Sequence, residues 1–183
     1  FVLRPIKLAI STLKSQDCSL ADCFIDLVCL GAAIKRLLEN DHRNFCQQAI
    51  AIFNRRFAEF DNNAYILCFF LHSGYTDVWA RGTFRCILLA ADAYYEKIDK
   101  TPKERKMLMF QMRNYYYRIL PFDILFDDSE SPSVWWMSLE DNFLKNKDHI
   151  CQLAHKLFFV TPHAAGCKRI WSALGWYYGK HHT

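Results

Sequence analysis

The sequence predicts an all-α protein, and three observations carry this prediction. Apolar residues recur at intervals of three and four along most of the 183-residue chain, which is the spacing of one face of a helix. Two short motifs are typical of helix N-termini. The chain holds only 6 Gly and 5 Pro, and no segment alternates apolar and polar residues convincingly as a half-buried strand would. With 52% hydrophobic and 23% charged residues, the composition indicates a globular core and excludes a disordered chain.

The N-terminal third contains two predicted helices. Ser19 and Asp22 have the spacing of a capping box, and apolar residues follow at helical intervals, which predicts a helix over about 19–39. We expect Asp41 to cap the next helix, whose apolar side runs from Phe45 to Phe60.

The middle third continues the helical pattern. A short apolar stretch over 65–71 ends in a turn signal at 72–74, and a further helix is expected over 84–98. Thr101-Pro102-Lys103-Glu104 combines an N-cap hydroxyl, a proline at the first helical position and a capping glutamate. The helix that begins there is expected to run to about Leu120 and to stop at Pro121.

Charge and proline content divide the chain into three regions. Residues 1–121 form a helical region with a net charge of +5, and 122–132 form an acidic, exposed linker. The C-terminal region 133–183 begins with a tryptophan pair. It continues with a helix near 144–159, a break at Thr161-Pro162 and a final helix near 164–178. Two basic flanks around an acidic segment permit a polyanionic partner without requiring one.

Composition also restricts the compartment. The eight cysteines include no C-x-x-C pair and most lie within apolar helical patterns, which favours a reducing compartment, the cytosol or the nucleus. No apolar run approaches the ~20 residues that cross a bilayer. Because the chain begins with Phe1 and not with Met, we expect it to be a piece of a longer protein.

Common catalytic and cofactor-binding motifs do not occur in the sequence. The phosphate-binding loop, the dinucleotide fingerprint, the nucleophile elbow and H-E-x-x-H are all missing, so no cofactor and no small-molecule substrate are expected. His163 and Cys167 have the spacing of one helix face, but a zinc site needs more ligands, and a packed Cys is the better interpretation. The pairs Asp127-Asp128 and Glu140-Asp141 are better interpreted as solvated surface than as a metal site.

Basic and aromatic residues gather at three places without requiring a nucleic acid. Lys35-Arg36 and Arg55-Arg56 close two predicted helices, where positive charge favours the helix dipole. The tyrosines at 115–117, between two arginines, have a composition that suits base stacking, but an amphipathic core helix explains them better.

The last fifty residues carry a more specific pattern. A tryptophan pair, Trp135-Trp136, precedes an amphipathic helix and Leu157-Phe158-Phe159-Val160-Thr161-Pro162. Then follow His163-Ala164-Ala165-Gly166-Cys167-Lys168-Arg169-Ile170-Trp171-Ser172-Ala173-Leu174-Gly175-Trp176-Tyr177-Tyr178-Gly179-Lys180. This segment resembles the C-terminal dimerisation region of hAT-superfamily transposases. In that family a proline and small residues precede a helix that reads S/C-E-R-hydrophobic-F/W-S-x-x-G. The resemblance covers about 133–180 and is weaker upstream. There Phe70-Leu71-His72-Ser73-Gly74-Tyr75 looks like a short family motif, and the helical region 1–121 around it looks like the family's all-helical insertion.

The resemblance implies a fragment of a ribonuclease H-like transposase whose core strands are missing from this chain. Two strand-borne aspartates and one glutamate hold divalent metals in that family, and the glutamate belongs to the C/S-E-R triplet. This chain has Cys167-Lys168-Arg169, with a lysine at the position of the glutamate. Because a protonated ammonium repels a cation and has no lone pair, the resemblance implies a catalytically inactive protein without a metal site.

The sequence therefore predicts a protein-dimerisation module of a degenerate or domesticated hAT-type transposase, located in the nucleus. We expect it to form a homo-oligomer and to reach DNA through the parent transposase, with no membrane contact. The residues expected to carry packing, association and the family motif are Trp135, Trp136, Leu157, Phe158, Pro162, Cys167, Arg169, Trp171, Ser172, Gly175, Trp176 and Tyr177. The rival interpretations are a C-terminal fragment of an active transposase whose catalytic aspartates lie outside this chain, and an unrelated helical interaction domain.

Overall fold

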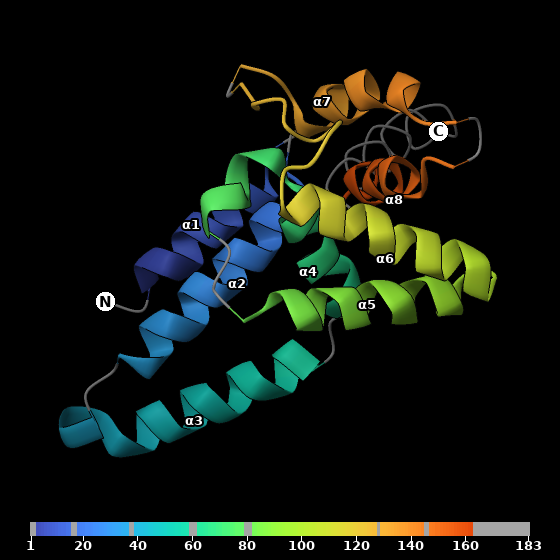
Figure 1. Cartoon of the computed structure of the whole chain (residues 1–183). Coiled ribbons are helices and arrows are strands. Elements are labelled where there is room, and N and C mark those ends of the chain that lie inside the picture. The colour runs from blue at the N-terminus through green and yellow to red at the C-terminus, as the bar shows by residue number, and fades with distance from the viewer. Residues whose placement is uncertain are drawn as a thin grey trace, which may run out of the picture.

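The computed structural model describes residues 3–15, 18–36, 39–58, 62–78, 82–127, 129–144 and 147–162. These residues confirm the predicted all-α class and contain no strand (Figure 1). The helices in chain order are α1 (Leu3–Leu13), α2 (Leu20–Lys35), α3 (Glu39–Ala58), α4 (Asn62–Leu71), α5 (Phe84–Lys97), α6 (Pro102–Tyr116), α7 (Pro132–Leu139) and α8 (His149–Phe158). Two short 3₁₀ turns, η1 (Ser73–Val78) and η2 (Glu140–Asn142), follow α4 and α7.

Both predicted capping boxes are present. At the start of α2, the amide of Ser19 donates to the Asp22 carboxylate over 2.9 Å, and the Asp22 amide donates to the Ser19 hydroxyl over 3.3 Å. At the start of α6, Thr101 and Glu104 make the same two bonds over 2.8 and 3.3 Å. Each box satisfies amide groups that no helical carbonyl can reach, and so fixes where these two helices begin.

One core joins six of the helices. α4 lies in the middle of the bundle and packs on α2, α5 and α8, while α6 packs on α5 and α8 (Figure 1). Four residues of α4 are fully buried there, Leu67, Cys68, Phe70 and Leu71. α1 and α3 contribute no described residue to this core: both pack on α2, and α3 lies along the lower edge of the molecule in Figure 1.

The acidic segment 122–132 is a connection within this core. Phe122 is buried against the tryptophan pair, and buried residues on both sides of the segment belong to the same cluster. The remainder of the segment that the structure describes is largely exposed, as the sequence predicts. The regions 1–121 and 133–162 therefore share one core.

Several predicted helix boundaries are wrong. α6 ends at Tyr116 and not near Leu120, because Arg118 adopts a left-handed conformation (φ 51°) and the Ile119 amide bonds back to the Asn114 carbonyl. α3 begins at Glu39, so Asp41 lies inside the helix and is not its N-cap. α8 begins at His149, five residues later than predicted. The sequence pattern did not identify α1.

None of the described helices combines the length and apolar character that a membrane crossing requires.

Candidate interaction site around the tryptophan pair

α7 brings Trp135 and Trp136 into the centre of the molecule. The helix is short, and it is fixed by Ser131, whose hydroxyl accepts the Val134 amide over 3.3 Å, and by a proline in its first turn. Both indoles are buried, and they meet edge to face with centroids 5.0 Å apart. Adjacent residues on a helix point in different directions, so two neighbouring indoles are buried together only where a core surrounds both sides of the helix.

The core around the indoles is aromatic. The ring centroid of Tyr115 in α6 lies 5.1 Å from that of Trp136 and 6.1 Å from that of Trp135. The ring centroid of Phe122 lies 6.2 Å from that of Trp136. The Trp136 Nε1–H donates to the carbonyl oxygen of Leu71 over 2.8 Å. This bond satisfies the last residue of α4, whose carbonyl has no partner within its own helix. α7 is thereby attached to α4 as well as to α6.

Gln111 of α6 fixes the start of α8. Its side-chain oxygen accepts the amide of Ile150 over 3.0 Å, and its side-chain nitrogen donates to the carbonyl of Lys147. Asp148, the residue before the helix, makes no capping bond with its side chain. Gln111, 39 positions earlier than Ile150, therefore accepts the amide that an N-cap side chain would accept. This explains why the sequence pattern misplaced the start of α8.

α8 uses its apolar side within the chain. Ile150, Ala154 and Leu157 are buried, as the sequence predicts, and Phe158 is half-buried with its ring 5.9 Å from His72. The hydroxyl of Tyr95 donates to the His149 carbonyl over 2.8 Å. Trp135, Trp136 and Leu157 thus stabilise the core and are not available to a second chain. Pro162, the last described residue, is half-buried.

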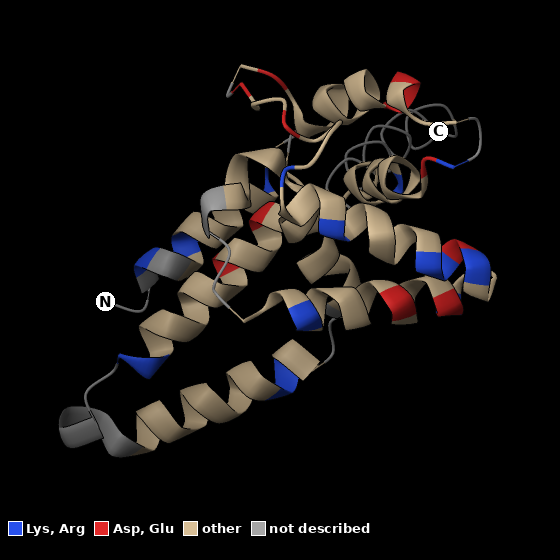
Figure 2. Cartoon of the chain, viewed as in Figure 1, with Lys and Arg blue, Asp and Glu red and all other residues tan. Residues whose placement is uncertain are grey.

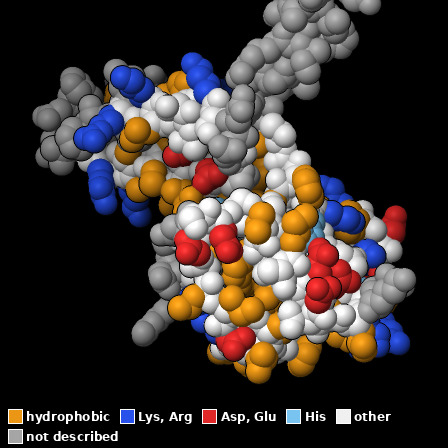
Figure 3. Space-filling model, turned by 90° about the horizontal axis from the view of Figure 1, so that it is seen from above, with side chains coloured by type: hydrophobic (Ala, Val, Ile, Leu, Met, Phe, Trp, Pro, Cys, Tyr) orange, Lys and Arg blue, Asp and Glu red, His pale blue; other side chains and the backbone are white. Residues whose placement is uncertain are grey.

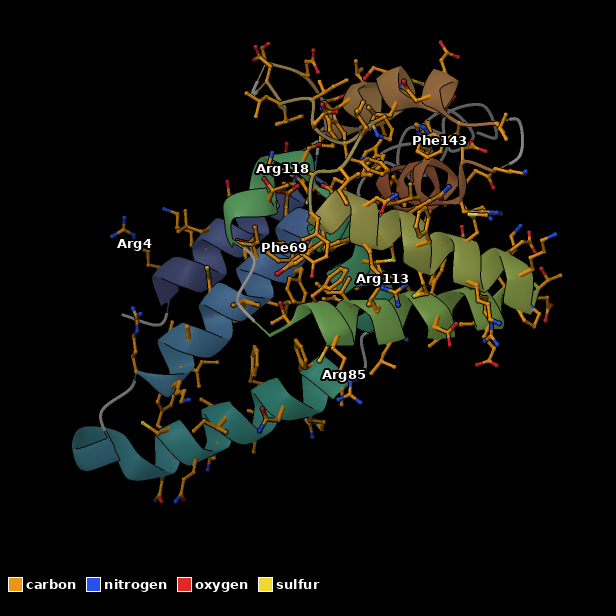
Figure 4. The ribbon with its side chains drawn as sticks, viewed as in Figure 1. Arg4, Phe69, Arg85, Arg113, Arg118 and Phe143 are labelled. Atoms are coloured by element: carbon orange, nitrogen blue, oxygen red, sulfur yellow. The ribbon has the colours of Figure 1, made fainter. Side chains whose placement is uncertain are left out.

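The side chains directly after α8 are exposed. Phe159 is 72% exposed and Val160 is also exposed, although both are apolar. On α7, Val134 and Met137 are exposed on the side of the helix away from the core. Figure 4 shows Phe143 beside α7 and α8, where its ring packs on Phe122 at 5.9 Å. The tryptophan pair and α8 thus form a fixed support with apolar residues at its outer end.

A second cluster joins the motif around His72 to α2. Tyr75 donates its hydroxyl proton to Asp22 over 2.6 Å, and the His72 ring stacks on Tyr75 at 4.0 Å. Burial alone would raise the pKa of Asp22, but the hydrogen bonds from Tyr75 and Ser19 outweigh it and lower the pKa. Burial lowers the pKa of His72, although the nearby Asp22 carboxylate opposes this shift. The cluster binds the turn after α4 to the start of α2.

The other candidate groups have structural roles in the described chain. Tyr115 is buried and Tyr116 stacks on Phe84 at 4.1 Å, so only Tyr117 of the three tyrosines presents an exposed ring. The Glu140 Oε1 lies 2.6 Å from the His155 Nε2, and this contact connects the end of α7 to α8. Lys35, Arg55 and Arg56 occupy last helical turns, as predicted. Within the described ranges, no three His, Cys, Asp or Glu side chains are grouped to hold a metal ion.

Part of the sequence motif lies outside the described residues. This applies to Cys167, Arg169, Trp171, Ser172, Gly175, Trp176 and Tyr177, and to His163 and Lys168. The sequence pattern did not predict that Gln111, Tyr95 and the Leu71 carbonyl anchor α7 and α8. A glutamine at a core position of the α6 helical pattern is the one signal that would have identified Gln111, because buried polar side chains need partners.

Comparisons with protein-family models, with curated proteins and with solved structures found no match to this chain.

Proposed function

We propose that this chain is a self-association module from the C-terminal part of a catalytically inactive, hAT-type transposase. The observation that carries the proposal is at the end of α8. The apolar side of this helix is buried in the chain's own core, whereas Phe159 and Val160, which directly follow the helix, are exposed. Large contiguous apolar patches usually mark partner sites, and in this proposal Phe159 and Val160 form one edge of such a patch. The aromatic-rich segment that resembles the hAT dimerisation region follows immediately, over 163–178.

α7 and α8, which precede the segment 163–178, provide a rigid base for self-association. An association surface needs a rigid base, because ordering a flexible segment on binding costs conformational entropy. Trp136 and Gln111 hold α7 and α8 on the bundle through bonds to Leu71 and Ile150. In this proposal, the buried Trp135, Trp136 and Leu157 position the surface, and Trp176 and Tyr177 contact the second copy.

Catalytic inactivity belongs to the same proposal and rests on Lys168. A lysine ammonium at the position of the family's metal-binding glutamate opposes the binding of a divalent cation. Nuclear location and DNA contact through the parent protein follow from the resemblance and are part of the proposal. The rival proposal, a fragment of an active transposase, requires metal-binding aspartates outside this chain and another metal ligand in place of Lys168.

Sedimentation velocity tests the proposed self-association. The chain is compared at ~50 µM with the double variant Trp176→Ser/Tyr177→Ser and with the matched control Phe110→Ser, which removes an exposed aromatic ring from α6. We expect the double variant to raise the dissociation constant by roughly tenfold or more, and the control to leave it unchanged. A wild-type chain that stays monomeric, or a double variant that associates as the wild type does, would contradict the proposal.

A further inference from the structure

α2 and α3 form the walls of an apolar cleft near the N-terminal end of the molecule. α2 and α3 approach closely where the Phe53 ring crosses Gly31, and its Cζ lies 3.0 Å from the position that a Cβ on Gly31 would occupy. Phe53 also lines a cleft of about 670 Å³ between the two helices, and Ile6 of α1 borders the same cleft. Leu27, Leu30 and Ile34 of α2 and Phe45, Ile52 and Phe57 of α3 line it. We call this site the α2–α3 cleft.

The α2–α3 cleft is open to solvent and apolar. Phe45 is 55% exposed and Ile52 is 54% exposed, although both line the cleft. Large apolar side chains on an exposed concave surface are typical of a site that another segment covers.

The border of the α2–α3 cleft is basic. Arg56 lines it, Arg55 is exposed beside it on α3, and Lys35 ends α2 next to Ile34. In Figure 2 the Lys and Arg positions of α2 and α3 lie near the ends of these helices, α1 carries two along its first half, and Figure 4 shows Arg4 directed away from the body of the molecule. Among the described side chains of the three helices, only Asp22 and Asp26 are acidic, and Tyr75 binds Asp22. A segment that docks here is therefore expected to be apolar with acidic flanks.

Between α6 and α7 the same chain exposes an apolar segment whose acidic residues lie at its C-terminal end, while Arg118 near its N-terminal end donates to the Thr76 hydroxyl. Leu120 is 75% exposed and Leu125 is 79% exposed, and three further exposed apolar residues lie with them within 117–125: Tyr117, Ile119 and Ile124. Asp123 and Asp127 are exposed in or next to this stretch, which we call the 117–125 connection. In Figure 2 the acidic loop between α6 and α7, which includes this connection, lies at the top, on the opposite side of the molecule from α3.

The 117–125 connection cannot enter the cleft of its own chain. Phe122 and Phe126 hold it against Trp136 and His72, with ring distances of 6.2 and 6.4 Å. In Figure 3, Lys and Arg side chains gather around hydrophobic side chains at the α1–α3 end, whereas the other half shows acidic and basic side chains together. The 117–125 connection can therefore reach an α2–α3 cleft only on another molecule.

We propose that the α2–α3 cleft of one copy receives the 117–125 connection of a second copy. Leu120 and Leu125 fill the cleft, and Asp123 and Asp127 lie against Arg55 and Arg56 at its border. Each copy keeps one unused cleft and one unused connection, so the contact is heterologous and repeats along a growing assembly unless it closes into a ring. This contact uses other residues than the association through Trp176 and Tyr177 and does not depend on it.

A complementation experiment tests this contact in the Trp176→Ser/Tyr177→Ser background, which removes the association proposed above. One variant adds Phe45→Ser/Ile52→Ser to disable the cleft, and the other adds Leu120→Ser/Leu125→Ser to disable the connection. All four side chains are at least half exposed, so both variants are expected to keep the fold, which circular dichroism checks. We expect the background protein to associate more weakly than the wild type but still to form assemblies that grow between about 10 and 100 µM, and each variant alone to be monomeric.

The equimolar mixture of the two variants is the decisive sample. One intact cleft and one intact connection are then present on different molecules, so we expect a 1:1 dimer and nothing larger. Arg55→Glu/Arg56→Glu should weaken the contact roughly tenfold, and Asp123→Lys/Asp127→Lys on the opposite partner should restore it. A monomeric background protein, a mixture without the dimer, or single variants that still assemble would overturn the proposal. A monomeric protein whose cleft binds an acidic amphipathic peptide would assign the cleft to a foreign partner instead.

Discussion

The indole nitrogen of Trp136 donates a 2.8 Å hydrogen bond to the carbonyl of Leu71, which lies 65 positions earlier in the chain. The donor belongs to α7 and the acceptor to the end of α4, so the bond joins the two parts of the chain that the acidic segment 122–132 separates in sequence. Both residues are fully buried, and water cannot replace either partner.

Trp136→Ala is expected to lower the free energy of unfolding by about 3–5 kcal/mol, because it opens a cavity in the aromatic core. Trp136→Phe retains much of the ring but leaves the Leu71 carbonyl without its donor, and about 1–3 kcal/mol of loss is expected. Urea denaturation followed by circular dichroism measures both variants. Met137→Ala, at an exposed position of the same helix, is the control and should change the value by less than ~0.5 kcal/mol. Equal stability of Trp136→Ala and the control would contradict the assigned role.

Gln111→Met should destabilise the chain although it preserves the size of the side chain. The substitution leaves the Ile150 amide and the Lys147 carbonyl without their partner, and each buried unsatisfied group costs about 1–3 kcal/mol. Hydrogen exchange measured by NMR locates the effect, and we expect faster exchange in the first turn of α8. Lys106→Met, at an exposed position of α6, is the matched control. Unchanged protection of Ile150 in Gln111→Met would show that Gln111 does not cap the helix.

Stability should decrease as the pH falls below about 6.5, the ordinary pKa of histidine. Burial lowers the pKa of both His72 and His149 in the folded chain, so below this pH the unfolded chain binds more protons than the folded one. The stability that the neutral rings provide is present above pH 6.5 and is lost as the pH falls through the lowered pKa values. Urea midpoints between about pH 5 and 7.5 measure the slope. The double variant His72→Gln/His149→Gln should flatten it, and an equal slope in this variant would exclude these two histidines as its source.

Titration with Mg²⁺ or Mn²⁺ is expected to reveal no stoichiometric binding, because Lys168 replaces the carboxylate that the resemblance implies. Isothermal calorimetry measures the binding, and incubation with supercoiled DNA measures cleavage. Lys168→Ala, which removes the charge without adding a ligand, serves as the matched variant and should also be inactive. A stoichiometric metal site or DNA cleavage by the purified chain would refute the inactive assignment and favour the rival fragment of an active transposase.

The sequence was sufficient where the determining interaction is local. The boxes at Ser19–Asp22 and Thr101–Glu104 involve partners three residues apart, so the pattern that predicts them contains both partners. The buried side of α8 was predicted from the spacing of Ile150, Ala154 and Leu157, because helical period and burial are linked.

The sequence pattern did not predict helix boundaries or burial correctly where these depend on a residue distant in the chain. α8 begins at His149 because Gln111 caps it from another helix, and no local signal at 144–149 reports this. α6 ends early because Arg118 adopts a left-handed conformation that is more typical of glycine. The burial of both neighbouring indoles depends on Tyr115 and Phe122, which approach α7 from α6 and from the 117–125 connection.

Intermolecular cross-linking of mixed isotopic chains tests the central claim most directly. Equal amounts of ¹⁴N- and ¹⁵N-labelled chains carry a photoreactive phenylalanine analogue at position 159, where the native Phe159 is exposed. We predict that mass spectrometry finds mixed-isotope cross-links from position 159 to residues within 159–178 of the other copy, and that Trp176→Ser/Tyr177→Ser abolishes them. Cross-links confined to single-isotope pairs, or mixed cross-links that the double variant leaves unchanged, would contradict self-association through this region.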